Sequence, residues 1–197
     1  SKTVIDGVKM NKAIFLDRDG TINVEKHYLN KIGDFEFLPG VIEGLKLLQD
    51  AGFLLIIVTN QSGIGRGYYS EEDFNVLTKW MMQTLKQSGV KITQVYFCPH
   101  LPDAMIEKYR KDCDCRKPKP GMYLKAVEDY DIDLSKSYVI GDKIRDCAIC
   151  KDTECRGFLI ADNEKAEIIN DVQDGKYERV SYELSLFDCA KRIVEQK

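Results

Sequence analysis

AIFLDRDGT, at residues 13–21, is the stretch that decides the fold. Four apolar residues run directly into two carboxylates, a glycine and a threonine. A run this short, bounded by charge and glycine, is typical of a buried parallel strand whose carboxyl end opens into a loop. Because ligands of open α/β sheets bind at that end, we expect the functional site beside Asp17 and Asp19.

The two aspartates have the spacing that phosphoryl chemistry needs. Two residues apart on an extended backbone, Asp17 and Asp19 face the same side and can share one hard cation. One carboxylate can then attack phosphorus while the other carries the proton. The pattern Asp-x-Asp-Gly-Thr after an apolar strand resembles the first motif of the haloacid dehalogenase superfamily, most of whose members are magnesium-dependent phosphatases. The structural alternative is a solvated strand edge that ends on two aspartates.

The next segment predicts a second strand beside the first. Residues 22–38 have no periodicity and are expected to form an ordered loop over the site. Pro39-Gly40 precede a helix whose apolar stripe ends at Gly52. A buried strand at 53–58 then stops at Thr59. Two strands joined by one helix form a right-handed βαβ unit, so both loops open on the same edge of the sheet.

The remaining pattern predicts an α/β protein with a three-layer, Rossmann-like fold around a parallel central sheet. The single Trp80 is interpreted as core packing within a long amphipathic helix that Ser70 and Asp73 cap. Residues 1–10 are expected to be an N-terminal extension and residues 11–197 a single domain. Further strands are expected at 92–97, 138–140 and 157–160. Helices are expected at 121–130 and 184–194, with a short helix that ends at 148. Irregular or surface segments are expected at 98–119 and 162–178.

Composition argues against several classes of function. The chain has 197 residues, 44% of them hydrophobic, and a net charge of -3. No apolar run approaches the ~20 residues that span a bilayer and no signal-peptide pattern opens the sequence, so we expect a soluble, cytoplasmic protein without a membrane partner. The negative charge argues against a nucleic-acid partner, which usually needs a basic face. Seven cysteines, several close together, fit metal binding better than a disulfide framework.

Four polar clusters are predicted to meet at the carboxyl edge of the sheet, where phosphoryl transfer needs mainly the placement of charge. Asp17 would attack the phosphoryl group and become a transient aspartyl phosphate, while Asp19 would protonate the leaving oxygen and later activate water. Magnesium would be held by Asp17, a backbone carbonyl near Asp19, and Asp142. Thr59 would hydrogen-bond the phosphoryl oxygens, Lys117 would neutralise developing charge, and Arg116 would grip a second anionic group.

A second cluster is expected to bind a different metal. Cys98-Pro99-His100 is followed by Cys113-Asp114-Cys115. Two close pairs of soft ligands across a loop are what a closed, structural zinc site needs. Such a zinc ion would pin the loop that presents Arg116 and Lys117. The alternative is a set of buried thiols beside a hydrogen-bonded histidine.

Five segments carry a closer resemblance. They are Asp17-Arg18-Asp19-Gly20-Thr21-Ile22-Asn23, Thr59-Asn60-Gln61-Ser62-Gly63-Ile64, Cys98-Pro99-His100, Cys113-Asp114-Cys115-Arg116-Lys117-Pro118 and Gly141-Asp142-Lys143. Together they closely resemble the D-glycero-D-manno-heptose 1,7-bisphosphate phosphatases, over about residues 12–160. The related histidinol-phosphate phosphatases share nearly the same set.

The resemblance implies a magnesium-dependent phosphoric monoester hydrolase. Such an enzyme removes the C7 phosphate to give heptose 1-phosphate, during synthesis of nucleotide-activated heptose for lipopolysaccharide, capsule or S-layer glycans. The family's roles fall on Asp17, Asp19, Thr59 and Lys117 for catalysis, on Asp17, Asp19 and Asp142 for Mg²⁺, on Cys98, His100, Cys113 and Cys115 for Zn²⁺, and on Glu25, Lys26, His27, Tyr28, Asn60, Gln61, Ser62, Arg116 and Lys143 for substrate contacts.

Histidinol phosphate is the alternative substrate. It carries a positive amine, whereas bases such as Arg18, Arg66 and Lys119 lie in or beside the predicted site loops and favour a sugar bisphosphate. Only about forty residues separate Asp17 from Thr59, too few for an inserted lid domain beside the predicted helix and strand. We therefore expect a capless, monomeric enzyme with an open site and a small phosphorylated sugar as substrate.

Several residues keep two interpretations. Asp146 either orients Lys143 or a metal-bound water, or caps a helix. His27 either contacts the ligand or is a solvated loop residue. Four further cysteines either form a second metal cluster or are small buried residues; they are Cys147, Cys150, Cys155 and Cys189.

Two other classes of protein remain as alternatives. A nucleic-acid end phosphatase shares the first motif, but the acidic charge and the lack of an aromatic-basic stretch count against it. A non-catalytic, zinc-stabilised interaction domain gives no reason for Asp17, Asp19, Lys117 and Asp142 to occur together.

Overall fold

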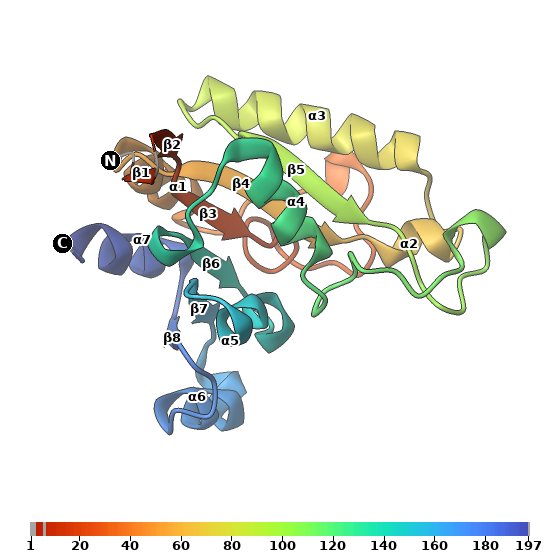
Figure 1. The fold of residues 1–197 in the computed structure, drawn as a ribbon. Helices are drawn as coiled ribbons and strands as arrows, with labels where there is room; N and C mark the ends of the chain where they lie inside the picture. Colours follow the sequence, from red (N-terminus) through yellow and green to blue (C-terminus); the bar gives the residue numbers. More distant parts are fainter. Residues whose placement is uncertain (1–2, 6, 197) are drawn as a thin grey trace.

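In the computed structural model, which describes residues 3–5 and 7–196, six parallel strands form one sheet in the order β5-β4-β3-β6-β7-β8 (Figure 1). The chain begins this sheet at its middle with β3, builds outward to β5, and then returns to add β6 on the other side. The direction of winding therefore reverses between β3 and β6, where ligands of open sheets bind. The strands are β3 (Ala13–Leu16), β4 (Leu54–Asn60), β5 (Gln94–Cys98), β6 (Tyr138–Gly141), β7 (Arg156–Ile160) and β8 (Val180–Glu183).

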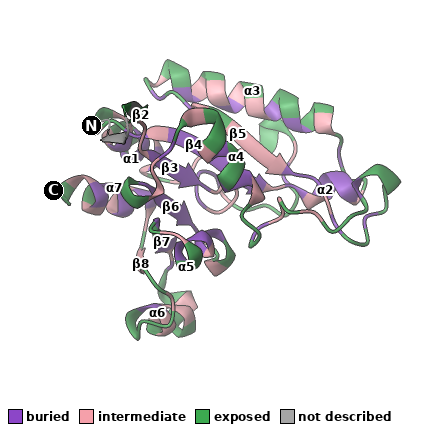
Figure 2. Ribbon diagram, viewed as in Figure 1, coloured by how far each residue is buried: buried purple, intermediate pink, exposed green. Residues whose placement is uncertain are grey.

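Side chains of the central strand alternate between two separate core layers. Ile14 and Leu16 pack in a cluster with α1, α3 and α7. Ala13 and Phe15 pack in a second cluster with α4 and α5. The predicted three-layer α/β fold is confirmed, and the buried strands lie between two outer layers of half-exposed helices (Figure 2). The helices are α1 (Val41–Asp50), α2 (Ser62–Gly65), α3 (Glu71–Gln87), α4 (Gly121–Tyr130), α5 (Ile149–Asp152), α6 (Ala166–Gln173) and α7 (Leu186–Glu195).

Helix α3 begins at the capping residues that the sequence predicted. Ser70 and Asp73 form the predicted capping box, each side chain accepting the other residue's backbone N–H. Trp80 lies in this helix and packs against Phe35 and Phe37, with ring centroids 5.4 and 6.4 Å away. Its predicted role in core packing is confirmed, and the contact ties the loop after β3 to α3.

The C-terminal part differs from the sequence prediction. Residues 162–178, predicted as a surface segment, contain helix α6, and β8 follows it as an edge strand. Both are short; Val172 is the buried residue of α6, and each β8 residue is half-buried. At the other end, β1 (Thr3–Ile5) and β2 (Val8–Met10) form an antiparallel hairpin within the predicted extension.

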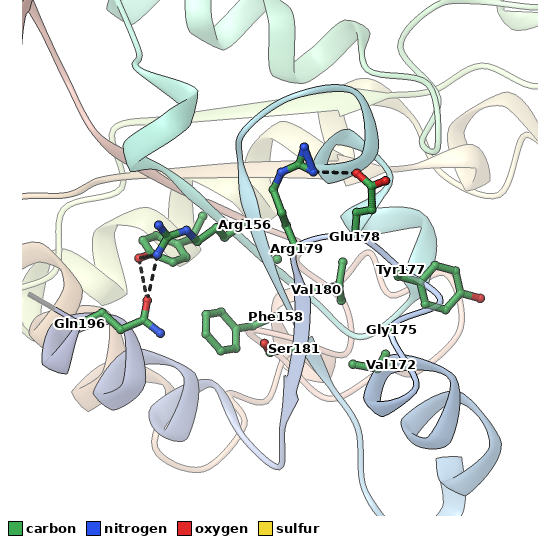
Figure 3. Close-up of a pocket in the computed structure, with 12 residues that line it drawn as sticks. Arg156, Phe158, Val172, Gly175, Tyr177, Glu178, Arg179, Val180, Ser181 and Gln196 are labelled. Carbon is green, nitrogen blue, oxygen red and sulfur yellow. Dashed lines mark hydrogen bonds and ion pairs between the residues drawn. The ribbon is translucent and has the colours of Figure 1, made fainter.

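The catalytic edge of the sheet carries loops rather than a lid domain. Between β3 and α1, the described chain forms a loop with one 3-10 turn at Ile32–Asp34, which confirms the capless architecture. A separate cavity of about 440 Å³ lies at the opposite edge, where Arg156 hydrogen-bonds Gln196 and Arg179 pairs with Glu178 (Figure 3). None of the predicted site residues lines that cavity. Within the described residues, every helix is too short or too polar to cross a lipid bilayer.

Candidate active site

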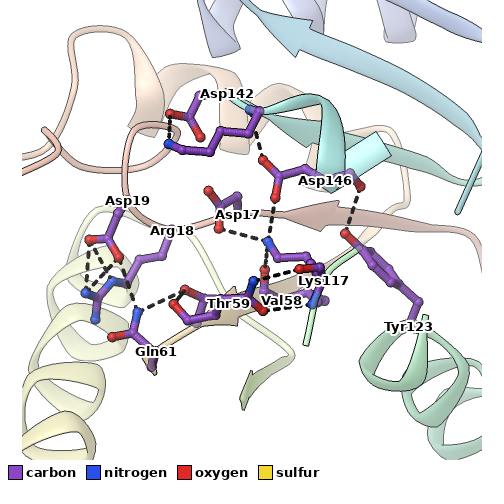
Figure 4. Close-up of polar contacts among 12 residues, drawn as sticks. Asp17, Arg18, Asp19, Val58, Thr59, Gln61, Lys117, Tyr123, Asp142 and Asp146 are labelled. Carbon is purple, nitrogen blue, oxygen red and sulfur yellow. Dashed lines mark hydrogen bonds and ion pairs between the residues drawn. The ribbon is translucent and has the colours of Figure 1, made fainter. Parts of the chain in front are cut away.

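Lys117 is the centre of the polar network at the carboxyl edge (Figure 4). Its ammonium group lies 3.0 Å from Asp17 Oδ1, 2.7 Å from Asp146 Oδ1 and 2.7 Å from the Val58 carbonyl oxygen. The residue is only 2% exposed. Burial lowers the pKa of Lys117, but Asp17 and Asp146 outweigh that effect and raise it, so the ammonium keeps its charge.

Lys117 does not follow a strand end, as the prediction of four clusters on four strands required. The strand that precedes it, β5, ends at Cys98 instead, and Lys117 lies in the turn before α4. Asn60 at the end of β4 holds that turn: its amide donates to the Lys117 carbonyl at 3.1 Å and accepts from the Lys117 N–H at 2.9 Å. Asn60 thus has a structural contact that the sequence did not predict.

The carboxylates beside Lys117 form an oxygen-rich cluster. Asp17, Asp142 and Asp146 each offer an oxygen within 4.8 Å of the others. Burial, with the charge of Asp146, raises the pKa of Asp17 to about 6 despite the opposing effect of Lys117. Burial and the charge of Asp17 raise the pKa of Asp142, whose buried Oδ1 has no hydrogen-bond partner among the described residues. A hard divalent cation would relieve this repulsion, so the donor set fits Mg²⁺.

Gly20 is required by the same cluster. Its φ is +84°, and a Cβ there would lie 2.2 Å from Asp142 Oδ2. Only glycine allows the loop after β3 to approach the Asp142 carboxylate this closely. The glycine of the first motif therefore sets the distance between two aspartate-bearing loops.

Asp19 accepts hydrogen bonds from its own set of donors. The Arg18 Nη2 atom lies 2.9 and 3.0 Å from the two carboxylate oxygens, and Asn23 Nδ2 lies 2.9 Å from Oδ1. Gln61 Nε2 donates to Asp19 Oδ2 at 3.2 Å and to Thr59 Oγ1 at 2.9 Å. The sequence identified each of these residues, but not that they form one network.

Asp146 has both a capping contact and a contact with Lys117. Its carboxylate accepts the Lys143 backbone N–H at 3.1 Å, which caps the short helix that begins at Ile144. The helix-cap interpretation therefore holds, and the pairing with Lys117 adds a link to the catalytic cluster that sequence spacing does not reveal.

A cavity of about 340 Å³ opens beside Asp19. Among the predicted substrate contacts, Lys26 does not line it; the Lys26 ammonium instead binds the Asp34 carbonyl and pairs with Glu36. Sequence analysis noted Arg66 only as a nearby base and missed Tyr69 and Arg145, because neither belongs to a motif. The cavity is lined by Asp19, Glu25, His27, Tyr28, Asn60, Gln61, Ser62, Arg66, Tyr69, Arg116, Lys143 and Arg145.

The loop at the cavity rim has an uncommon backbone conformation. His27 and Tyr28 have φ values of 49° and 57°, in the left-handed region that non-glycine residues rarely occupy. Glu25 stabilises the turn by accepting the His27 N–H at 2.7 Å. His27 is exposed and yet lines the cavity, so it is both solvated and within reach of a ligand.

The predicted zinc ligands converge on one point. Cys98 Sγ lies 3.5 Å from Cys113 Sγ and 2.9 Å from Cys115 Sγ, and His100 Nδ1 lies 3.3 Å from Cys115 Sγ. The hydrogen bond that joins Cys115 and Cys98 lowers the pKa of Cys115 to about 5. Three thiols and one imidazole nitrogen so close together are compatible with a closed tetrahedral zinc site.

The other cysteines lie in the core. Cys147 and Cys150 pack against Gly157, where a Cβ would lie 3.0 Å from each sulfur. Cys189 belongs to the core layer on the opposite face of the sheet. Within the described part of the chain, these thiols join no cluster of metal-ligating atoms, which favours their interpretation as small buried residues.

Comparison with known proteins agrees with this geometry. A family model described as polynucleotide kinase 3 phosphatase matches residues 12–171. A crystal structure of D,D-heptose 1,7-bisphosphate phosphatase from B. bronchiseptica, complexed with magnesium and phosphate, superposes with a TM-score of 0.80 at 30% identity, covering 94% of this chain and 99% of that one. The fold and site thus define a phosphatase of the haloacid dehalogenase superfamily.

Curated relatives narrow this class further. A D-glycero-beta-D-manno-heptose-1,7-bisphosphate 7-phosphatase from Pasteurella multocida is 44% identical over 93% of this chain and 97% of its own length. The protein of that name from Haemophilus ducreyi is 52% identical over 68% of this chain and 74% of its own length. The chain belongs to the D-glycero-beta-D-manno-heptose-1,7-bisphosphate 7-phosphatase family.

Proposed function

We propose that this protein hydrolyses the C7 phosphate of D-glycero-β-D-manno-heptose 1,7-bisphosphate. The observation that carries the proposal is the cavity beside Asp19, which is lined by four basic side chains and by the carboxylate of the acid–base residue. A substrate with two phosphates matches that charge, because one can lie at Asp17 while the other meets the basic wall. The names of the curated relatives support the β anomer. The four bases are Arg66, Arg116, Lys143 and Arg145.

The chain's own carboxylates would perform the covalent steps. One oxygen of Asp17 attacks phosphorus, the bond from phosphorus to the sugar oxygen breaks, and Asp19 supplies the proton that the leaving oxygen takes up. Asp19 then removes a proton from a water molecule, which attacks the aspartyl phosphate and releases inorganic phosphate from Asp17. Lys117 and the Thr59 hydroxyl stabilise the charge on the phosphoryl oxygens.

Asp17, the backbone carbonyl of Asp19, and Asp142 would hold Mg²⁺ in this proposal. When bound, the ion supplies positive charge that neutralises the phosphoryl group and the attacking carboxylate. Zinc would be bound by Cys98, His100, Cys113 and Cys115 and would have a structural role, because four protein ligands leave no open position. We propose that these residues act within a single domain at residues 11–197 and that the protein is a monomer.

Phosphate release in the presence of Mg²⁺ tests the substrate. The two anomers of heptose 1,7-bisphosphate would be compared with histidinol phosphate, fructose 1,6-bisphosphate and a DNA oligonucleotide with a 3′-phosphate, using Asp17→Asn as the blank. We expect the β anomer to have the highest kcat/KM, and Asp17→Asn to fold normally without turnover. Preference for histidinol phosphate or for the oligonucleotide would refute the substrate assignment, whereas full activity of Asp17→Asn would refute the mechanism.

A further inference from the structure

Asp19, the acid–base residue of the proposed mechanism, is held by a buried hydrogen-bond network that includes residues outside the active-site motifs. Arg18, which pairs with Asp19, is only 1% exposed and is fixed by the Leu29 carbonyl oxygen at 3.1 Å. The Asp19 Oδ2 atom accepts hydrogen bonds from Arg18 at 3.0 Å and from Gln61 at 3.2 Å. Arg18 lies in the same loop as Asp19, after β3, whereas Gln61 lies in the loop after β4. The Gln61 amide therefore links the β4 loop to the Asp19 carboxylate.

The orientation of the Gln61 amide depends on a tyrosine outside every motif. The Tyr69 hydroxyl donates a hydrogen bond to Gln61 Oε1, on the side of the amide opposite Asp19. If the amide were reversed, its oxygen would face the Asp19 carboxylate and two acceptors would repel each other. Burial raises the pKa of Tyr69 well above its usual range, so the phenol stays protonated and can donate.

The position of Tyr69 is in turn set by packing. A Cβ at Gly63 would lie 2.3 Å from a ring carbon of Tyr69, so the ring lies directly on the backbone of α2. The same ring is part of a buried cluster with Leu101, Ala104 and Tyr109 from the loop that carries the predicted zinc ligands. The ring therefore has a fixed place between α2 and that loop, and the hydroxyl has a fixed direction.

From this geometry, and resting on the proposed function, we propose that Tyr69 is a positioning residue for the acid–base step. Its hydroxyl fixes the Gln61 amide so that the amide N–H orients the Asp19 carboxyl group toward the leaving oxygen. Tyr69 itself transfers no proton. Removal of the hydroxyl should impair the protonation of the leaving oxygen by Asp19 and should leave attack by Asp17 unchanged.

Two phosphate esters separate these steps. A sugar phosphate releases an alkoxide that needs the proton of Asp19, whereas 4-nitrophenyl phosphate releases a phenolate that leaves unprotonated. Tyr69→Phe keeps the ring against Gly63 and removes only the hydroxyl. We expect its kcat/KM on the sugar phosphate to fall about tenfold and its kcat/KM on the aryl ester to change less than about twofold. The ratio kcat/KM includes only the steps up to departure of the leaving group, so it excludes the later attack of water, which also needs Asp19 and is common to both esters. Equal losses on both esters, or no loss on either, would overturn the proposal.

The control is Tyr109→Phe, which removes a hydroxyl from the same buried cluster and should retain wild-type rates on both esters. In a Gln61→Leu background, which also removes the donor to Thr59 Oγ1, the added Tyr69→Phe change should cause no further loss on either ester, because Tyr69 acts through Gln61. Additive losses would contradict this coupling. If the proposed sugar substrate is wrong, the wild-type enzyme will not hydrolyse it. The comparison of variants then uses an alkyl phosphate that the wild-type enzyme does hydrolyse.

Discussion

At the scale of single residues, one contact of Lys117 could be predicted from its sequence motif and another could not. Its sequence context predicted a cation beside Asp17, and the ammonium group does lie 3.0 Å from that carboxylate. The pairing with Asp146, 29 positions further along the chain, could not be predicted because it depends on how the turn before α4 meets the loop after β6. The contacts of Asn60 with Lys117 and of Lys26 with Asp34 and Glu36 could not be predicted either, because a sequence motif does not show which way a side chain points.

Lys117→Met should remove the cation that contacts both Asp17 and Asp146. Two buried carboxylates would then lose their partner, so we expect the free energy of unfolding to fall by about 3–5 kcal/mol. Turnover should fall by about 10²–10³-fold or more, because the phosphoryl oxygens lose a fixed positive charge. Urea unfolding and steady-state phosphate release measure the two effects. Lys119→Met, at an exposed lysine that pairs with Asp112, is the matched control, and similar losses in both variants would contradict this account.

At the scale of elements, residues 98–119 show how an irregular segment becomes ordered. The sequence predicted an internal clamp there, and the four ligand-type side chains do converge. The segment also packs on α2: the Ile106 N–H donates to the Gly65 carbonyl at 3.0 Å, and a Cβ at Gly65 would lie 2.6 Å from the Pro99 oxygen. These backbone contacts have no signature in the sequence apart from the glycines themselves.

Metal analysis should find about one zinc ion per wild-type chain and none in the double variant Cys98→Ser, Cys113→Ser. The double variant should also unfold at a lower temperature and turn over more slowly, because the loop that presents Arg116 and Lys117 is no longer pinned. Cys189→Ala is the control and should keep its zinc. Stoichiometric metal retained in the double variant would instead place a second site at the remaining cysteines.

At the scale of the whole molecule, strong periodicity determined what could be predicted. Strands β3 and β4 and helices α1, α3 and α4 were predicted close to their observed bounds, because each combines a clear apolar pattern with caps or glycines. Helix α6 and strand β8 were missed because they are only eight and four residues long and lie in a segment that is mostly polar. The strand order is a property of the assembled sheet, and it places the candidate site between β3 and β6.

Stability and catalysis should be separable across this fold. Ile193 of α7 is 2% exposed and packs in the core layer formed with α1 and α3. Ile193→Ala should lower the free energy of unfolding by about 2–5 kcal/mol through the cavity it leaves. The value of kcat below the unfolding transition should be unchanged, because α7 supplies no side chain to the cavity beside Asp19. Val76→Ala, at a residue that is 56% exposed, is the control, and a fall in kcat of Ile193→Ala would show that the two properties are coupled.

The contact of Trp80 with Phe35 and Phe37 has a practical consequence. Trp80 is the only tryptophan in the chain, and its two aromatic neighbours lie on the same loop as Glu25 and Tyr28 at the cavity rim. Indole fluorescence depends on the polarity and the quenching groups around the ring. We therefore expect ligand binding to change the emission of Trp80, which would report on the loop that faces the substrate without an attached dye.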